Sequence, residues 1–294
     1  MHTHPHLKPG DKVTITAVSS PCNQTKLDAG VKLLESLGLK VHVAESCRQT
    51  HPTAPYLAAT DRKRAADLHT AFADPYTKAI FAARGGYGAA RILPLLDFEL
   101  IKKNPKPFIG FSDATALHIA LNQICNISTY HGPMPAANLS AEADALTLES
   151  LKYAVFGNPA KPPAMHFKTL VPGEVTAPLI GGNLSVATAS LGTPYEIDTR
   201  GKILFLEEID EPPYRIDRMF LQLKQAGKFR DAAGIALGDF SPETAETLHT
   251  AIAELILPTG KPTICNIQCG HTSPTLTLPM GIMVSLHQLQ KCVH

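Results

Sequence analysis

Three residues that together can hydrolyse an amide, Ser112, Glu207 and His271, each lie at the expected end of a strand or in a tight turn. A serine hydroxyl is a weak nucleophile until a histidine takes its proton, and a carboxylate then orients and stabilises that histidine. The apolar run 107–111 predicts a strand and residues 113–122 predict a helix, so Ser112 occupies a sharp strand-to-helix turn. The residue types therefore indicate acyl-transfer chemistry with Ser112 as the nucleophile.

Each of these residues also has a structural interpretation. A serine such as Ser112 before an Ala-rich helix is a common N-cap. Glu208 and Glu211 lie within four residues of Glu207, and spacing alone does not choose among the three carboxylates. A loop histidine such as His271 often only hydrogen-bonds to backbone. The residue types by themselves leave these alternatives open.

A glycine-rich stretch over residues 84–88 offers backbone N–H groups for an oxyanion. Glycine lets the backbone approach a ligand closely, and we expect Gly86 N–H and Asp113 N–H to form the oxyanion hole. Gly85 and Tyr87 are candidate substrate contacts. The stretch could instead be only a tight turn or a weak phosphate cradle. It has neither the dinucleotide-fingerprint spacing nor a P-loop lysine, so nucleotide binding is the weaker of these alternatives to an oxyanion hole.

Alternating strand and helix patterns indicate how these residues are positioned. Repeated strand–helix units predict a doubly wound parallel sheet, in which ligands bind at the carboxyl ends of the strands. Asn183, after two glycines, is a candidate for binding substrate through its amide, whereas His131 is expected to be structural. The expected strands cover 13–18, 41–44, 79–83, 109–111 and 203–206, and the expected helices cover 25–37, 60–72, 89–96 and 113–122.

The chain is expected to fold as two domains. Residues 1–156 predict an N-terminal α/β domain that carries the nucleophile. Four prolines within 157–173 indicate a linker, and 174–294 predicts a smaller mixed α+β domain with the acid and the base. The active site is then expected in the cleft between the domains.

Composition excludes several classes of function. The net charge of +1 gives no basic surface of the kind that nucleic-acid binding requires. No apolar run approaches the ~18 residues of a membrane span, and no signal-peptide pattern precedes residue 10, so we expect a cytoplasmic protein. Cys265 and Cys269 resemble half of a metal site, but no second pair completes it. We therefore expect no metal, no cofactor and reduced cysteines.

Seven ordered motifs stand out along the chain. They are LKPGDKVTITAVSSP at 7–21, ARGGYGAAR at 83–91, IGFSD at 109–113, YHGPM at 130–134, PLIGGNL at 178–184, the carboxylate strand at 202–219 and the GHTSP loop at 269–281. Together they resemble the LD-carboxypeptidase family, the murein tetrapeptide carboxypeptidases of the S66 serine peptidases. The resemblance implies a triad of Ser112, Glu207 and His271, and removal of the terminal D-alanine from a muropeptide during cell-wall recycling. It also implies a homodimer.

Two other functions fit the same sequence. One is an activity of the same family, hydrolysis of an amide in a peptidyl-nucleotide antibiotic, which gives self-immunity. The other is a non-catalytic protein that captures a small ligand between two domains, and a fluorophosphonate would label no residue of such a protein.

Overall fold

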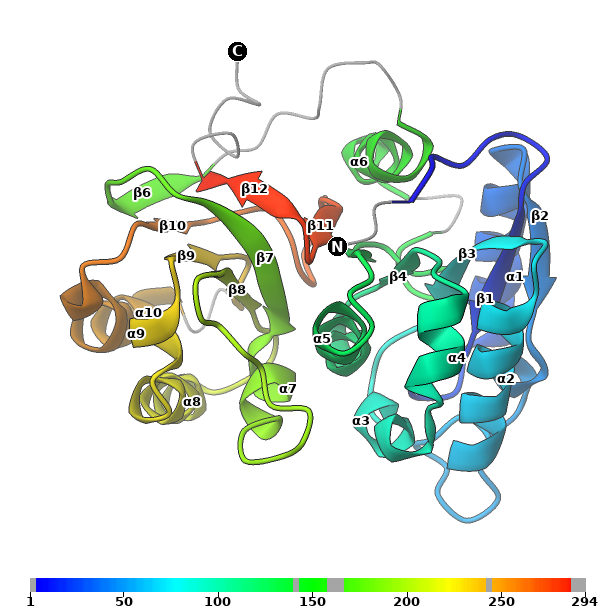
Figure 1. The fold of residues 1–294 in the computed structure, drawn as a ribbon, viewed down its shortest axis with the longest axis horizontal. Helices are drawn as coiled ribbons and strands as arrows, with labels where there is room; N and C mark the ends of the chain where they lie inside the picture. Colours follow the sequence, from blue (N-terminus) through cyan, green and yellow to red (C-terminus); the bar gives the residue numbers. More distant parts are fainter. Residues whose placement is uncertain (1–3, 140–142, 158–166, 242–244, 287–294) are drawn as a thin grey trace.

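A computed structural model describes residues 4–139, 143–157, 167–241 and 245–286 of the chain. Within these residues two six-stranded sheets lie side by side, each with helices packed on it (Figure 1). This arrangement confirms the predicted α/β class. No helix of the described residues is long and apolar enough to cross a membrane.

The first sheet has the strand order β11-β5-β4-β3-β1-β2. Neighbouring strands from β5 to β2 are parallel, as the repeated strand–helix units predict, and β11 is antiparallel at the edge. The strands are β1 Lys12–Thr16, β2 Lys40–Val43, β3 Thr77–Ala82, β4 Phe108–Gly110, β5 Thr129–His131 and β11 Leu278–Met280.

Helices cover both faces of the first sheet. Leu27, Leu34 and Val155 of α1 and α6 pack on one face, and Phe72 and Leu117 of α2 and α5 pack on the other. The helices are α1 Gln24–Ser36, α2 Asp61–Ala73, α3 Ala89–Ile92, α4 Phe98–Lys103, α5 Thr115–Gln123 and α6 Ala145–Phe156.

Two predicted helices differ from the structure in a way that local chemistry explains. Residues 89–96 form α3 and then a 3₁₀ turn over Leu93–Leu95, because Pro94 lacks the N–H that an α-helix needs. The helix expected over 113–122 begins instead at Thr115, after a 3₁₀ turn over Ser112–Ala114. Both differences lie beside the candidate active site.

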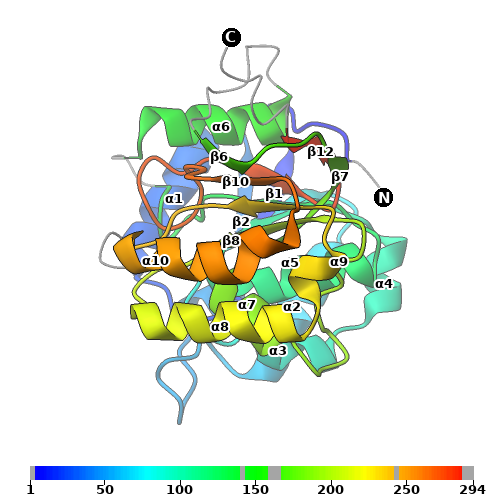
Figure 2. The same ribbon diagram turned by 90° about the vertical axis from the view of Figure 1, so that its left-hand side faces the viewer.

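The second sheet has the order β12-β7-β8-β9-β10-β6, with β7 to β10 parallel and both edge strands antiparallel. Helices α8, α9 and α10 cover its outer face, toward the viewer in Figure 2. The strands are β6 Lys168–Val171, β7 Thr176–Asn183, β8 Ile203–Glu207, β9 Gly234–Leu237, β10 Thr263–Cys265 and β12 Met283–Ser285. The helices are α7 Leu184–Ala189, α8 Pro213–Gln225, α9 Lys228–Asp231 and α10 Ala245–Ala251.

The segment predicted as a linker, residues 157–173, is partly structured. Gly157 ends α6 in a left-handed conformation, and β6 pairs with β10 in the second sheet. Residues 158–166 of this segment lie outside the described residues. The second sheet therefore includes residues that precede the predicted start of its domain at 174.

The molecule has two halves, the first built on the sheet of β1 to β5 and the second on the sheet of β6 to β10. Two features join these halves. Strand β11 comes from the predicted second domain but pairs with β5, so the chain after His271 returns to the first sheet. Helix α5 lies against β7, and its Ile119 packs into the core of the second half (Figure 1). The Thr115 hydroxyl also accepts a hydrogen bond of 2.9 Å from Asn183 N–H. These contacts hold the two carboxyl edges of the sheets close together.

Candidate active site

Ser112 lies in the strained turn that the strand-to-helix pattern predicts. It follows β4 and adopts a φ of 62°, a left-handed conformation that costs a non-glycine residue about 1–2 kcal/mol. The Asp113 carboxylate supports this turn by accepting hydrogen bonds from the Ser19 hydroxyl at 2.5 Å and from Ala89 N–H at 2.7 Å. Burial raises the pKa of Asp113. Its side chain therefore ties the turn to the segment after β1 and to the start of α3.

The glycine loop between β3 and α3 lies directly against Ser112. A Cβ on Gly85 would lie 2.9 Å from Ser112 Oγ and 3.6 Å from Asp113 N, so only glycine fits there. Gly86 has a φ of 109°, and a Cβ on it would overlap the Ser20 hydroxyl. The predicted oxyanion donors, Gly86 N–H and Asp113 N–H, donate to no acceptor among the described residues.

Glu207 and His271 form a hydrogen-bonded pair in the second half. Glu207 is the last residue of β8 and is fully buried, and its Oε2 lies 2.8 Å from Nδ1 of His271. Gly270 allows this approach, because a Cβ there would lie 2.8 Å from the same carboxylate oxygen. Since Nδ1 faces the carboxylate, Nε2 is the ring nitrogen that remains for proton transfer.

The environment of this pair favours a protonated imidazole. Burial lowers the pKa of His271, but the hydrogen bond and the charge of Glu207 outweigh it, and the pKa lies above the usual value. Burial raises the pKa of Glu207, and the bond from His271 offsets part of that rise. A carboxylate in this position stabilises the imidazolium that forms when a histidine acts as a base.

The His271 ring reaches across to the first half of the molecule. Its edge packs on Phe111, the residue before Ser112, with ring centroids 4.9 Å apart. The described hydrogen bonds do not include one between Ser112 Oγ and His271. The structure thus brings the histidine to the nucleophile turn without a direct bond between them.

The other two candidate carboxylates have different partners. Glu208 accepts hydrogen bonds from Asn183 Nδ2 at 2.8 Å, from Ile209 N–H at 3.0 Å, and from both the N–H and the hydroxyl of Ser185. Glu211 pairs with Arg215 at 3.3 Å on the surface. Of the three, Glu207 is the carboxylate that contacts His271.

Asn183 and His131 occupy supporting positions. The Asn183 side chain caps α7 by accepting from Val186 N–H, and it donates to Glu208, so its amide already has protein partners. His131 is fully buried between Phe111 and Phe205, and neither ring nitrogen has a partner among the described residues. Burial holds the pKa of His131 well below its usual value.

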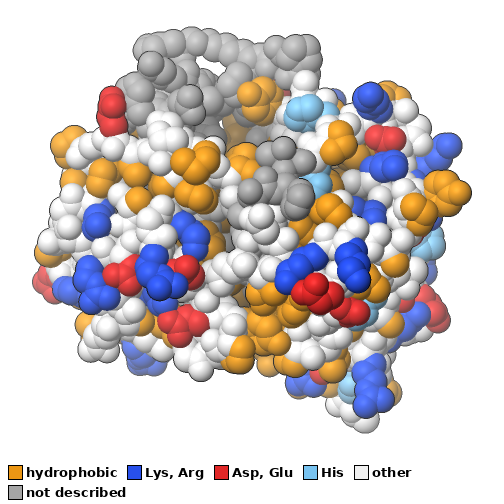
Figure 3. All heavy atoms as spheres, in the orientation of Figure 1, with side chains coloured by type: hydrophobic (Ala, Val, Ile, Leu, Met, Phe, Trp, Pro, Cys, Tyr) orange, Lys and Arg blue, Asp and Glu red, His pale blue; other side chains and the backbone are white. Residues whose placement is uncertain are grey.

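A pocket of about 620 Å³ opens beside Ser112 and is lined by both halves of the molecule. Figure 3 shows hydrophobic side chains gathered between the halves. Asp113 and Glu208 are the charged residues of the lining. The apolar lining includes Ala90, Leu93, Pro94, Ala116, Ile119, Val186, Ala189, Pro194 and Ile209, and the polar lining includes Ser112, Asn183, Ser185, Ser190 and Thr193.

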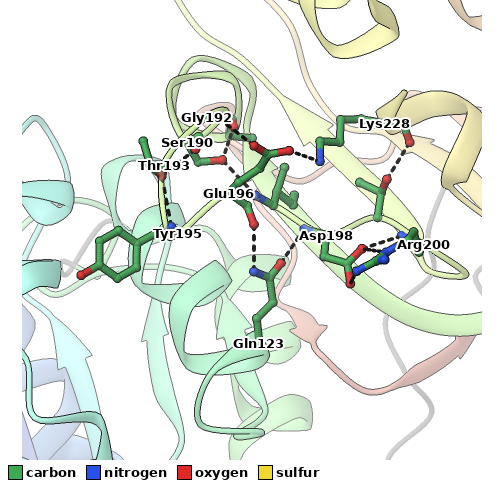
Figure 4. A network of polar contacts seen from close by, with 12 residues as sticks. Gln123, Ser190, Gly192, Thr193, Tyr195, Glu196, Asp198, Arg200 and Lys228 are labelled. Carbon is green, nitrogen blue, oxygen red and sulfur yellow. Dashed lines mark hydrogen bonds and ion pairs between the residues drawn. The ribbon is translucent and has the colours of Figure 1, made fainter. Parts of the chain in front are cut away.

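One wall of this pocket is the loop of residues 190–198, here called the wall loop. A network of hydrogen bonds holds it in place (Figure 4). Gln123 of α5 donates to the Glu196 carbonyl at 3.0 Å and accepts from Asp198 N–H at 2.7 Å. The Glu196 carboxylate binds Lys228 at 2.5 Å and Gly192 N–H at 2.7 Å. The wall loop is therefore fixed to both halves of the molecule.

Two supporting side chains have roles that the sequence patterns do not indicate. The backbone N–H of Asp113 is a predicted oxyanion donor, but its carboxylate binds partners from elsewhere in the chain. Arg64 is fully buried and donates to the carbonyls of Val18 and Gly88. Local patterns give no indication of partners this distant. Among the described residues there is no group of three or more His, Cys, Asp or Glu that could hold a metal.

Comparisons with known proteins agree with this architecture. The family model of the LD-carboxypeptidase N-terminal domain matches residues 13–132, and that of the C-terminal domain matches residues 176–286. A Bacillus subtilis (strain 168) protein described as a probable murein peptide carboxypeptidase is 40% identical, over 97% of this chain and 91% of its own.

Solved structures of two related proteins are also similar to this chain over nearly its whole length. The muramoyltetrapeptide carboxypeptidase from Oxalobacter formigenes is 27% identical, with a TM-score of 0.78 over 93% of this chain and 94% of its own. The MccF-like protein of Bacillus anthracis is also 27% identical, with a TM-score of 0.87 over 97% and 95% of the two chains. The matches confirm the resemblance seen in the sequence, and the chain belongs to the LD-carboxypeptidase family of S66 peptidases.

Proposed function

We propose that the protein is a serine LD-carboxypeptidase that releases the terminal D-alanine from murein tetrapeptide. The bond cleaved joins the L-configured centre of a diamino acid to D-alanine. The observation that carries the proposal is the His271–Glu207 pair, whose ring packs beside the turn of Ser112. The names of the similar muropeptide carboxypeptidases support the substrate class.

The first half of the proposed reaction is acylation. Ser112 Oγ attacks the scissile carbonyl carbon while His271 Nε2 takes the hydroxyl proton. The carbonyl oxygen becomes an oxyanion and binds the N–H groups of Asp113 and Gly86. Collapse of this intermediate breaks the C–N bond, and His271 gives its proton to the departing amine of D-alanine. The remaining peptide is then esterified to Ser112.

The second half is hydrolysis of the ester. A water molecule enters the position that D-alanine has left, and His271 takes a proton from it as it attacks the ester carbonyl. The second tetrahedral intermediate collapses, and His271 returns the proton to Ser112 Oγ. The products are the tripeptide and D-alanine, and the enzyme regains its starting protonation state.

The test is incubation of the purified protein with murein tetrapeptide, followed by mass spectrometry for loss of one alanine. Ser112→Ala is expected to fold normally and to lose nearly all activity, because it removes the attacking oxygen. Ser36→Ala, at an exposed position of α1, is the matched control and should retain full activity. Activity of Ser112→Ala within tenfold of the unsubstituted protein would remove Ser112 from the mechanism.

The same proposal includes a cytoplasmic homodimer that acts in cell-wall recycling on imported muropeptides. Sedimentation and cell fractionation test the assembly and the location. The second candidate function is hydrolysis of an amide in a peptidyl-nucleotide antibiotic, and the likeness to the MccF-like protein favours it. An aminoacyl sulfamoyl nucleoside in the same assay distinguishes the two functions. Only the antibiotic-hydrolysing function predicts release of the amino acid from this compound.

A further inference from the structure

Two exposed tyrosines form a pair at the mouth of the pocket. Tyr56 is 57% exposed and Tyr87 is 52% exposed, and their ring centroids lie 6.0 Å apart with the planes inclined by 53°. The rings come from separate loops, and Tyr87 also lines the pocket that contains Ser112. The pair therefore extends the surface of the pocket outward with two aromatic rings.

A single hydroxyl fixes the backbone of both tyrosines. Ser20 Oγ donates to the Tyr56 carbonyl at 2.8 Å and accepts from Tyr87 N–H at 3.1 Å. Ser20 N–H also donates to the carbonyl of Gly85, the glycine that packs on Ser112. The ring pair is thus held in a defined place relative to the nucleophile, which is the preorganisation that a binding site needs.

Polar groups that can bind hydroxyls lie next to the rings. Arg91 pairs with Asp61 at 2.8 Å, and both side chains remain partly exposed. The pKa of Arg91 is raised first by the Asp61 hydrogen bond, and the Tyr87 hydroxyl also contributes. An aromatic face beside a guanidinium and a carboxylate suits a ligand with one apolar face and hydroxyls at its rim.

We propose that Tyr56 and Tyr87 form a saccharide subsite that binds the pyranose ring of the muramoyl group at the amino end of the peptide. The C–H groups on one face of a pyranose carry partial positive charge and pack on the negative face of an aromatic ring. The scissile bond is at the carboxyl end of the peptide, so the sugar is the part of the substrate farthest from Ser112, and the ring pair is an exposed aromatic surface that adjoins the pocket of Ser112. This inference rests on the proposed function, since it takes a muramoyl peptide as the substrate.

The test measures binding in a Ser112→Ala background, where turnover does not interfere. Muramoyl tetrapeptide and sugar-free tetrapeptide are each titrated by calorimetry, and the ratio of the two dissociation constants reports the contribution of the sugar. We expect the muramoyl ligand to bind about tenfold more tightly. Adding Tyr56→Ala should bring the ratio close to one, whereas Tyr56→Phe should keep it because the ring remains.

Tyr76→Ala is the matched control, since this tyrosine is 75% exposed and lies outside the pocket lining, and it should leave the ratio unchanged. A ratio of one before substitution, or the same ratio after Tyr56→Ala, would overturn the subsite. A changed sedimentation coefficient of Tyr56→Ala with an unchanged ratio would assign the rings to an interface between copies instead. The proposed function has its own readout, which is alanine release from sugar-free tetrapeptide by the unsubstituted protein.

Discussion

Glu207 and Glu208 are adjacent in the chain but bind different partners. Glu207 contacts His271, whereas Glu208 accepts four hydrogen bonds from Asn183, Ser185 and Ile209. Glu207 ends β8 and Glu208 follows the strand, where hydrogen bonds hold the Glu208 carboxylate on Asn183 and Ser185 instead of His271. In the proposed mechanism only Glu207 orients the base.

Substitution of each carboxylate by its amide tests this difference. Glu207→Gln is expected to lower kcat by about 10⁴-fold, because the amide no longer stabilises the imidazolium. Glu208→Gln should have a much smaller effect, and Glu211→Gln, which breaks a surface ion pair, is the control with no effect on kcat. Steady-state kinetics on murein tetrapeptide measure all three. A larger loss in Glu208→Gln than in Glu207→Gln would assign the acid to Glu208.

The titration of His271 is a second test at the residue scale. Burial lowers the pKa of His271, but the Glu207 carboxylate more than offsets this effect, so we expect a pKa above the usual 6.5. The base acts in its neutral form, so activity should rise as pH increases through this pKa. NMR titration of the ring in Ser112→Ala should give the raised value, and Ser112→Ala/Glu207→Gln should titrate at lower pH. An equal pKa in both proteins would contradict the role of Glu207.

The loops that follow the strands position the site at the scale of elements. The glycine loop, the turn of Ser112 and the end of β8 all lie at carboxyl ends of parallel strands, where such sheets bind ligands. Glycines in these loops allow contacts that a side chain would block. Gly85 lies against Ser112, and Gly270 lies against Glu207.

Gly270→Ala tests whether this close approach matters. Its φ is 144° and a Cβ would lie 2.8 Å from Glu207 Oε2, so alanine should displace the carboxylate from His271. We expect kcat to fall by at least about 100-fold, by comparison with the loss of a triad carboxylate. Gly260→Ala is the control, because its φ is 65° but no atom lies within 4 Å of the added Cβ. It should lower stability and leave kcat unchanged. Equal kcat values for the two variants would contradict the prediction.

Specific hydrogen bonds from one helix fix the position of the second half of the molecule relative to the first. Helix α5 carries Thr115, which binds Asn183, and Gln123, which binds the backbone of Glu196 and Asp198 (Figure 4). The loop held by Gln123 forms one wall of the pocket. The position of this wall therefore depends on the contact between the halves.

Gln123→Ala should weaken substrate binding more than chemistry. It removes two hydrogen bonds and leaves backbone groups without them, which lowers the free energy of unfolding by about 1–3 kcal/mol. KM should rise several-fold while kcat changes little, because Gln123 contacts neither Ser112 nor His271. Urea unfolding and steady-state kinetics measure these effects. The exposed Gln222→Ala is the control, and an unchanged KM in Gln123→Ala would show that the wall is held by other contacts.

Local patterns in the sequence were sufficient for most of the first half. The strand expected over 13–18 is β1, Lys12–Thr16, and the helix expected over 60–72 is α2, Asp61–Ala73, which Thr60 caps. Hydrophobic periodicity and capping residues act within a few positions of the chain, so they are visible in a single sequence. The turn at Ser112 was predictable for the same reason.

Contacts between distant segments were decided only by the tertiary structure. Nothing near 278–280 in the sequence indicates that β11 pairs with β5 of the first sheet, or that the Asp113 carboxylate binds Ser19 and Ala89. The sequence by itself determined the α/β class and the family resemblance; spacing left three candidate carboxylates, and the resemblance implied Glu207. The tertiary structure brings the loop of His271 to Glu207 at the end of β8 and holds Glu208 on Asn183 and Ser185, because these contacts join segments that are far apart in the chain.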